Sequence, residues 1–159
     1  MDQVGGSADY VLKTTLLAQV AGQALPGSEQ VSLGGYYATR GYTIDDGSAD
    51  TGFILRNELA LPKVSLLGAL DLSDTPVVGK LNDTVAPYGF LDVAYGHSFN
   101  LNSTATDTNS TLVGLGVGLE YSLASNLRFG TNIGVALTDG PDQTQQGDVS
   151  AQMRITLAY

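Results

Sequence analysis

Apolar and polar residues alternate along most of this chain, and the alternation falls into six stretches separated by polar, Gly-rich or Pro-containing segments. Alternation at every second position is typical of a β-strand with one apolar face, because successive side chains of a strand point to opposite faces. The pattern predicts strands at residues 9–24, 52–61, 88–96, 112–121, 127–137 and 148–159. The sequence therefore predicts an all-β protein.

The charged residues of these strands fall on the face opposite the Leu, Val, Ile and Phe side chains. In the fourth stretch, for example, Leu115 and Val117 share one face, whereas Gly116 and Glu120 share the other. The charged strand positions are Lys13, Arg56, Glu58, Asp92, Glu120, Arg128 and Arg154. Each predicted strand thus has an apolar face and a polar face.

The connections between the strands alternate in length. A short turn is predicted at 122–126, the connection at 62–87 is the exception, and the long polar loops lie at 25–51, 97–110 and 138–147. Strands of about ten residues with two such faces, with long loops on one side and shorter turns on the other, are the signature of a transmembrane antiparallel β-barrel. A sheet in lipid must close on itself. Six strands do not close a wide barrel, so we expect further strands N-terminal to this chain.

A soluble β-sandwich is the alternative, since each of its strands also has one face in a core. The sandwich does not account for long strands that stay apolar up to Tyr159, nor for an uncovered polar face with several glycines. A chain that is monomeric and folded in buffer without detergent would favour this alternative, which would be a surface domain that only binds a partner.

Composition narrows the function further. The chain has 159 residues, which fits one domain over 1–159, with 16 acidic and 7 basic side chains and a net charge of -9. Nucleic-acid binding is disfavoured, because neutralising phosphates needs clustered Lys and Arg. There is no Cys and one His, so thiolate zinc sites and multi-His metal sites are excluded, and we expect no cofactor. No apolar run of 18 residues and no secretory signal is visible, which favours a chain whose front end is missing.

Residues 25–42, the first part of the long loop at 25–51, are the stretch around which the other predicted strands are arranged. The opening, LPGSEQVSLGGYYATRGY, is too long and too Gly-rich for a hairpin turn. Gly34 and Gly35 permit backbone geometry closed to other residues, and we interpret them as a hinge. The stretch then reaches Arg40, Gly41 and Tyr42, a fixed cation beside a flexible residue and an aromatic ring. We interpret it as a folded loop that carries one arginine to a defined place.

These residues resemble a known family. LPGSEQVSLGGYYATRGY, then ADTGFILRNELALP and then APYGFLDVAYG, are similar to the C-terminal barrel half of two-partner secretion transporters, the haemolysin-activator type of outer-membrane protein in Gram-negative bacteria. The resemblance covers residues 9–159. It implies a sixteen-stranded barrel of which this chain supplies the last six strands, with the long loop folded into the lumen and without the N-terminal barrel half or the periplasmic domains.

The resemblance also implies roles for single residues. Arg40 matches the loop-tip arginine, and Asp92 matches the acidic residue of the barrel wall that it contacts. Phe90 is the motif neighbour of that aspartate, Glu58 lies nearby on the adjacent strand, and Tyr159 resembles the terminal aromatic residue read by the barrel-assembly machinery.

Four positions depart from the family pattern. They are Val31, Thr39, Ala94 and the pair Ala49–Asp50. None removes a charge from the proposed pair.

An enzyme is not indicated. His97, Ser98 and Asp92 contain the side chains of a catalytic triad, but adjacent residues of a strand point to opposite faces. The resemblance implies instead translocation of a large secreted partner, of haemolysin or adhesin type, across the outer membrane. Outer-membrane lipid is then a second partner. A barrel-assembly factor that inserts other outer-membrane proteins is the related alternative, because it shares the Arg-Gly-aromatic loop.

Overall fold

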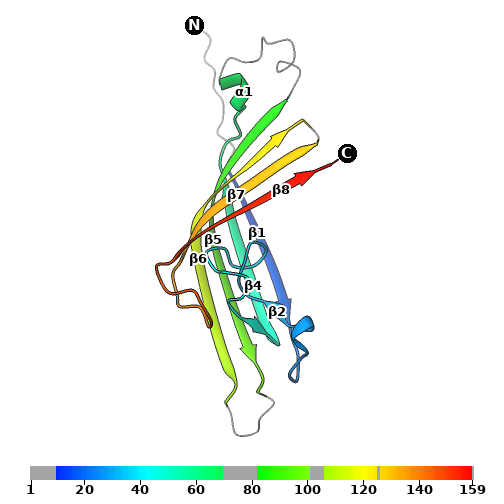
Figure 1. Cartoon of the computed structure of the whole chain (residues 1–159), viewed down its shortest axis with the longest axis vertical. Coiled ribbons are helices and arrows are strands. Elements are labelled where there is room, and N and C mark those ends of the chain that lie inside the picture. Colours follow the sequence, from blue (N-terminus) through cyan, green and yellow to red (C-terminus); the bar gives the residue numbers. More distant parts are fainter. Residues whose placement is uncertain (1–9, 70–81, 101–105, 125, 159) are drawn as a thin grey trace.

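The structure is a computed structural model that describes residues 10–69, 82–100, 106–124 and 126–158. Its main feature is a six-stranded antiparallel sheet in the order β1-β4-β5-β6-β7-β8 (Figure 1). The strands are β1 (Val11–Gln19), β4 (Thr51–Ala60), β5 (Asp83–Ser98), β6 (Thr108–Leu123), β7 (Leu127–Ala136) and β8 (Val149–Leu157). Each strand pairs with the next long strand along the chain, and the outer edges of β1 and β8 pair with no other described strand. The all-β prediction is confirmed, and the sheet is an unclosed portion of an antiparallel barrel wall.

Three residues on one side of the sheet define the face that we call the inner face: Asp92, Glu58 and Gly114. Against it lies the connection from β1 to β4, residues 20–50, which we call the inner loop (Figure 1). The inner loop contains a single 3-10 turn, η1 (Gly27–Glu29), and a small two-stranded ladder of β2 (Val31–Ser32) with β3 (Ser48–Ala49). The ladder closes the loop on itself, so its middle part projects as one folded unit.

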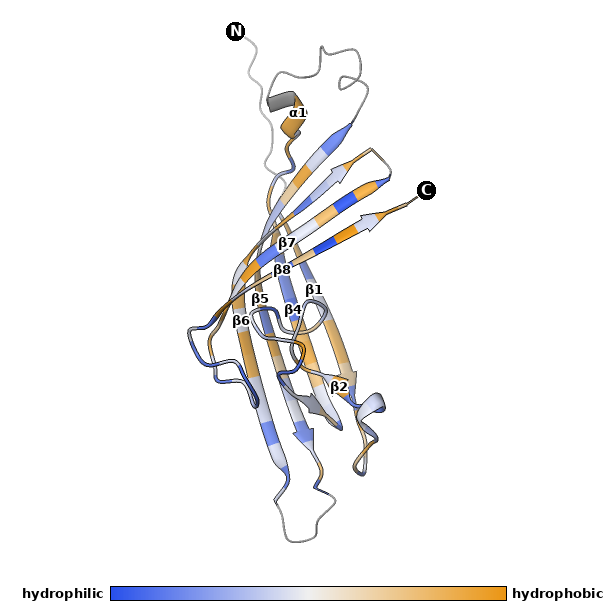
Figure 2. Ribbon diagram, in the orientation of Figure 1, coloured by the Kyte–Doolittle hydropathy of each residue, from blue (hydrophilic) through white to orange (hydrophobic). Residues whose placement is uncertain are grey.

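Orange, apolar bands recur along the strands (Figure 2), and cross-strand pairing places most of these apolar residues on the opposite, outer face. Leu91, Leu115, Val117, Ile133 and Ile155 lie on this face and are exposed. An exposed apolar surface of this kind is stable only against lipid or another apolar partner. This is the face that the sequence pattern assigns to the membrane.

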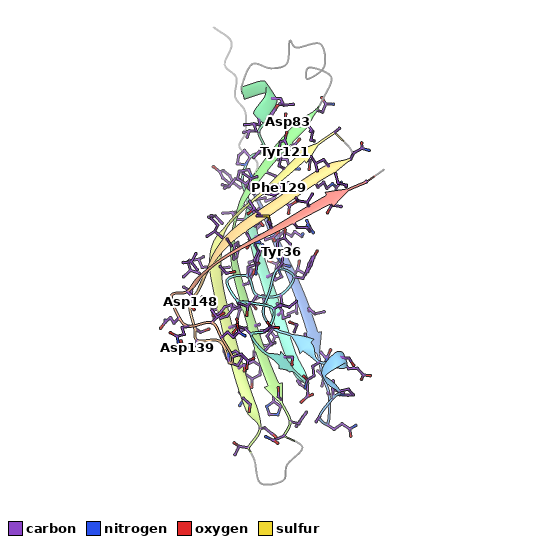
Figure 3. The ribbon with its side chains drawn as sticks, viewed as in Figure 1. Tyr36, Asp83, Tyr121, Phe129, Asp139 and Asp148 are labelled. Carbon is purple, nitrogen blue, oxygen red and sulfur yellow. The ribbon has the colours of Figure 1, made fainter. Side chains whose placement is uncertain are left out.

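Aromatic pairs mark the two ends of the outer face. Phe53 and Tyr95 stack with ring centroids 6.1 Å apart near the long-loop end, and Tyr121 pairs with Phe129 near the β6–β7 turn (Figure 3). Thr111 is the cross-strand partner of Tyr95, so ten residues of β6 separate the two pairs. Ten residues rise roughly 33 Å along a strand, or roughly 25 Å across a membrane when the strand tilts by about 40°. This height matches the apolar band of an outer-membrane barrel.

Several strand bounds differ from the predicted ones. β1 ends at Gln19 rather than at residue 24, and β5 begins at Asp83 rather than at residue 88. The longer β5 contains Pro87, which a central strand would exclude. The Pro87 carbonyl accepts a hydrogen bond from the amide of Leu61, which lies just beyond the end of β4. The nitrogen of a strand residue points to the same side as its carbonyl, so the missing N–H of Pro87 faces a place where the β4 ladder has already ended, and the proline is tolerated. Its other side pairs with Leu119 of β6.

The connection from β4 to β5 carries a single helical turn, α1 (Leu66–Ala69). Asp83 caps this turn: its carboxylate accepts hydrogen bonds from the amides of Leu66 and Leu67 at 2.8 and 3.2 Å and from the Ser65 hydroxyl at 2.5 Å. No helix of the described residues is long and apolar enough to cross a membrane.

A small apolar core joins the inner loop to the sheet. The loop contributes Val31, Leu33, Ala38, Tyr42 and Ala49, and the sheet contributes Ile54, Ala94, Leu112 and Ala136. Cross-strand pairing places Ile54 beside Ala94 and Ala94 beside Leu112 on the inner face. The inner face is therefore apolar where the body of the loop rests, and charged only beyond it.

Candidate functional site

Arg40 lies at the tip of the inner loop and is almost completely buried, with 1% of its surface exposed. Its Nε donates to Asp92 Oδ2 at 2.6 Å and its Nη2 donates to Oδ1 at 2.7 Å, which is a bidentate pair. The backbone amide of Arg40 also donates to Oδ2 at 3.1 Å. Asp92 is fully buried in β5. A planar guanidinium matches a carboxylate in this geometry, so the contact fixes both the position and the direction of the side chain.

Glu58 of β4 takes the remaining side of the guanidinium. Arg40 Nη1 donates to Glu58 Oε1 at 2.6 Å. Arg56 and Lys13 approach the same two carboxylates at longer range: Arg56 lies 3.6 Å from Glu58 and 4.0 Å from Asp92, and Lys13 lies 4.0 Å from Glu58. The loop arginine therefore contributes the shortest contacts to a mixed cluster of three cations and two anions.

Two aromatic rings cover the guanidinium. The Arg40 Cζ atom lies 3.9 Å from the centroid of the Phe90 ring and 5.6 Å from that of Tyr88. A cation over a ring face is attracted by the ring quadrupole, by about 2 kcal/mol when the pair is desolvated. Phe90 and Tyr88 precede Asp92 by two and four residues, so one strand supplies the carboxylate and both rings on the same face.

Glycines of β6 provide the space for this arrangement. Gly114, Gly116 and Gly118 are the cross-strand partners of Asp92, Phe90 and Tyr88, respectively. A Cβ at position 114 would collide with the Arg40 carbonyl oxygen, and a Cβ at 116 or 118 would collide with the Phe90 or Tyr88 ring. These three residues, which we call the glycine row, therefore form the surface on which the loop tip and the two rings pack.

The two residues after Arg40 continue the contact with the wall. Gly41 has φ +99°, and a Cβ at Gly134 of β7 would lie 2.9 Å from the Gly41 amide nitrogen. Tyr42 is fully buried, and its hydroxyl lies 3.0 Å from the Val113 carbonyl oxygen and 2.8 Å from that of Thr138. The amides of Val113 and Thr138 also donate to this hydroxyl, at 3.2 and 3.1 Å. Tyr42 therefore joins the backbone of β6 to the first part of the β7–β8 connection.

Two further buried aspartates hold the base of the inner loop, and the sequence reasoning assigned neither a role. Asp50 is fully buried; it accepts from the Gln30 side chain at 2.9 Å and from the amides of Leu25 and Phe99 at 2.7 Å each. The Gln30 bond, together with the two amides, outweighs burial and lowers the pKa of Asp50 below its ordinary value.

Asp46 is the second of these aspartates and is also fully buried. Burial alone would raise the pKa of Asp46, but hydrogen bonds from Thr144, Thr43 and the Gln143 amide outweigh it, so the pKa lies well below the ordinary value. Thr144 and Gln143 belong to the connection between β7 and β8, residues 137–148, which we call the β7–β8 loop. The signal in the sequence was the Asp-Asp-Gly turn at 45–47, which predicts a loop but not its partner.

The two glycines of the predicted hinge, Gly34 and Gly35, differ in their backbone conformation. Gly35 has φ +108°, a conformation that favours glycine, and no such value occurs at Gly34. A Cβ at Gly34 would instead collide with the Thr43 carbonyl oxygen, so this glycine permits close approach of two loop segments. Tyr159, the predicted assembly signal, lies outside the described residues.

A second ionic contact lies on the inner face beyond the loop tip. Arg154 of β8 contacts Glu120 of β6 at 3.3 Å, and its guanidinium lies 5.3 Å from the Tyr36 ring (Figure 3 labels Tyr36). Arg154 and Glu120 are partly exposed, at 39% and 36% of their side chains, so this pair contributes little to stability.

The triad-like residues are held in other contacts. The His97 ring lies 2.8 Å from the Asn109 side chain and 3.6 Å from Asp107, while Asp92 binds Arg40. In the part of the chain that the structure describes, no three His, Cys, Asp or Glu side chains gather to hold a metal ion. The site on the inner face therefore binds its own loop through charge and hydrogen bonds.

Comparison with known proteins agrees with this wall-and-loop arrangement. The sequence model of the family described as haemolysin secretion/activation protein ShlB/FhaC/HecB matches residues 2–121. The match spans the inner loop, both carboxylate-bearing strands and the glycine row of β6. Comparisons with curated proteins and with solved structures gave no match. The chain therefore belongs to the ShlB/FhaC/HecB family of haemolysin secretion/activation proteins, which are outer-membrane proteins of two-partner secretion.

Proposed function

We propose that this chain is part of an outer-membrane barrel that translocates a large secreted partner of haemolysin or adhesin type, and that the inner loop gates its lumen. The observation that carries this proposal is the bidentate contact between Arg40 and Asp92, buried on the inner face and completed by Glu58. A loop that only connected two strands would need no buried ion pair at its tip. The outer face lies in outer-membrane lipid, and the barrel-assembly machinery reads the terminal Tyr159.

The strength of the contact suits a reversible gate. A hydrogen bond to a charged group contributes about 1.5–3 kcal/mol, and removing one partner of a buried pair costs about 3–5 kcal/mol. These values bias a two-state loop strongly towards the docked form. They remain small enough for the entering partner to reverse, because folding of that partner outside the cell drives the transport without nucleotide.

The test uses the full-length protein in outer membranes. Arg40→Ala and Asp92→Ala are made separately and together, and secretion of the partner is measured beside the amount of inserted barrel. We expect each single change to reduce secretion while the barrel still inserts, and the double change to be no worse than either. Arg128→Ala is the matched control, because Arg128 is an exposed arginine of β7 on the same face.

Two outcomes would contradict the proposal. Unchanged secretion in both single variants would remove the inner loop from the transport mechanism. Normal secretion with reduced levels of other outer-membrane proteins would favour the related function of a barrel-assembly factor.

A further inference from the structure

The Asp46 carboxylate connects two loops that are far apart in the sequence. Its Oδ2 accepts from the amide and the hydroxyl of Thr43, at 2.8 and 2.7 Å, and from the hydroxyl of Thr144. Its Oδ1 accepts from the amides of Gln143 and Thr144, at 3.0 and 2.9 Å. Two of these donors belong to the inner loop and three to the β7–β8 loop. The five donors satisfy a fully buried carboxylate without a cation.

The backbones of the two loops also interlock around this carboxylate. The Gly47 amide donates to Asp142 Oδ2 at 3.2 Å, and a Cβ at Gly47 would lie 2.7 Å from the Pro141 ring. A Cβ at Gly140 would lie 2.6 Å from Asp46 Oδ1. Glycine on each side thus permits an approach that larger residues would prevent. Figure 3 labels two residues of the β7–β8 loop, Asp139 and Asp148.

Besides the contacts of Tyr42 with Val113 and Thr138 and of Asp50 with Phe99, two charged residues attach the inner loop to the rest of the molecule. Its tip is held by Arg40 on β4 and β5, whereas the segment after the tip is held by Asp46 on the β7–β8 loop. The tip attachment is an ion pair, and the second attachment consists of hydrogen bonds to one carboxylate. Loss of the tip pair alone leaves the second attachment intact.

We infer that Asp46 is a positioning residue that couples the β7–β8 loop to the inner loop, so that the two loops dock and release as one gate. The inference rests on the proposed gating function, since it names the second moving part of that gate. The inference adds to the ion pair a role for the β7–β8 loop in opening, although no described side chain of this loop contacts Arg40.

Asp46→Asn changes the hydrogen bonds of this side chain while nearly keeping its size. An Asn side chain nearly keeps the shape of Asp, but one of its two oxygens becomes an NH2 group. That NH2 group would face backbone amides in either orientation: those of Gln143 and Thr144, or that of Thr43. Donor would then meet donor at a buried position, which leaves polar groups unpaired.

The experiment reports loop mobility by spin labels in the full-length protein in lipid. Single cysteines replace Ile44, which is 75% exposed, or the exposed Gln145; this chain has no cysteine of its own. We expect Asp46→Asn to increase the mobility of both labels, with the undocked population rising by roughly tenfold or more. Asp45→Asn is the matched control, because Asp45 is the exposed neighbour with the same charge.

Thr144 provides a second, milder pair of variants in case Asp46→Asn prevents insertion. Thr144→Val removes the hydroxyl that donates to Asp46 and keeps the shape, whereas Thr144→Ser keeps the hydroxyl. We expect Thr144→Val to loosen both labels and Thr144→Ser to leave both unchanged. A merely space-filling role of the side chain would give the opposite order.

The inference is overturned if Asp46→Asn loosens only one of the two labels, or if Asp45→Asn loosens them equally. The measurement needs no secreted partner, so its failure differs from failure of the proposed function. Labels that loosen together with secretion unchanged would support the coupling and contradict gating. Labels that move independently, with secretion lost in Arg40→Ala, would overturn the coupling alone.

Discussion

Replacing Gly114 with Ala changes one methyl group and no charge, yet we expect it to expel the loop tip. A Cβ on Gly114 would lie well under 3.0 Å from the Arg40 carbonyl oxygen, a separation that real Cβ contacts essentially never show. The backbone of Gly114 is not in the left-handed region, so Ala itself is tolerated by the strand. The collision with the loop is the whole perturbation.

The sheet is the stiffer of the two parts, so the loop must move. Gly114 is paired on both sides, with Asp92 of β5 and Ala136 of β7. A shift of the tip by roughly 1 Å would stretch the 2.6 and 2.7 Å bonds between Arg40 and Asp92 beyond hydrogen-bonding geometry. Overpacking typically costs about 1–3 kcal/mol, which corresponds to a rise of roughly five- to 140-fold in the ratio of undocked to docked loop.

The assay is the mobility of a spin label at Tyr37, which is 73% exposed beside the tip, together with ion conductance through the barrel in planar bilayers. Gly89→Ala is the control, because the nearest atom to a Cβ at Gly89 is 3.9 Å away. We expect higher label mobility and conductance in Gly114→Ala and parent-like values in Gly89→Ala. Parent-like values in both variants would refute the packing of the tip on the glycine row.

Three further outcomes follow from the same contacts. Tyr42→Phe keeps the buried ring but loses the hydroxyl that bonds the backbone of Val113 and Thr138, so the docked loop should lose about 1 kcal/mol of stability, measured by the label at Ile44. Arg40→Lys should reduce secretion nearly as much as Arg40→Ala, because an ammonium group cannot bind one carboxylate through two fixed donors and reach Glu58 as well. The lowered pKa of Asp46 means that its stabilisation is complete above pH of about 4 and is lost as the pH falls through the pKa of the docked form. Mobility of the Ile44 label should therefore stay constant from about pH 7 to about pH 5, and an increase within that range would contradict the assignment.

The strands could be predicted because successive residues of a membrane-spanning strand face lipid and the barrel interior in turn, which favours alternating apolar and polar side chains. From Val113 to Tyr121 of β6 every second residue is apolar, and β7 follows the same period apart from Thr131, so the faces of both strands were predicted correctly from the sequence. The end of β5 and the start of β6 were not predicted, because residues 97–98 and 108–111 continue the strands beyond the apolar band as polar residues, where pairing alone maintains the ladder. Alternation of apolar and polar residues arises where one face of a strand meets lipid and the other meets water. A part of a strand that has water on both faces does not alternate.

The site was harder to predict because it depends on contacts between distant segments. Ile54 and Leu112 are apolar residues on the polar face, and the alternation alone makes them exceptions. The body of the inner loop packs on these two residues. An apolar residue at a position of the polar face is therefore the feature of the sequence that indicates where a loop docks. Asp46 left no comparable signal, since its five donors are three backbone amides and two Thr hydroxyls, which many sequences could supply.

The central claim is that the inner loop is held on the wall by the contact of Arg40 with Asp92. A double-mutant cycle tests it most directly: loop docking is measured with the Tyr37 label in the parent, in Arg40→Ala, in Asp92→Ala and in the double variant, all inserted in lipid. We predict a coupling free energy of about 3 kcal/mol or more, because each single change removes the bidentate pair and leaves the other buried charge with one neighbouring charge, Glu58 for Arg40 or Arg56 for Asp92. Additive effects, with a coupling free energy within about 0.5 kcal/mol of zero, would contradict the account.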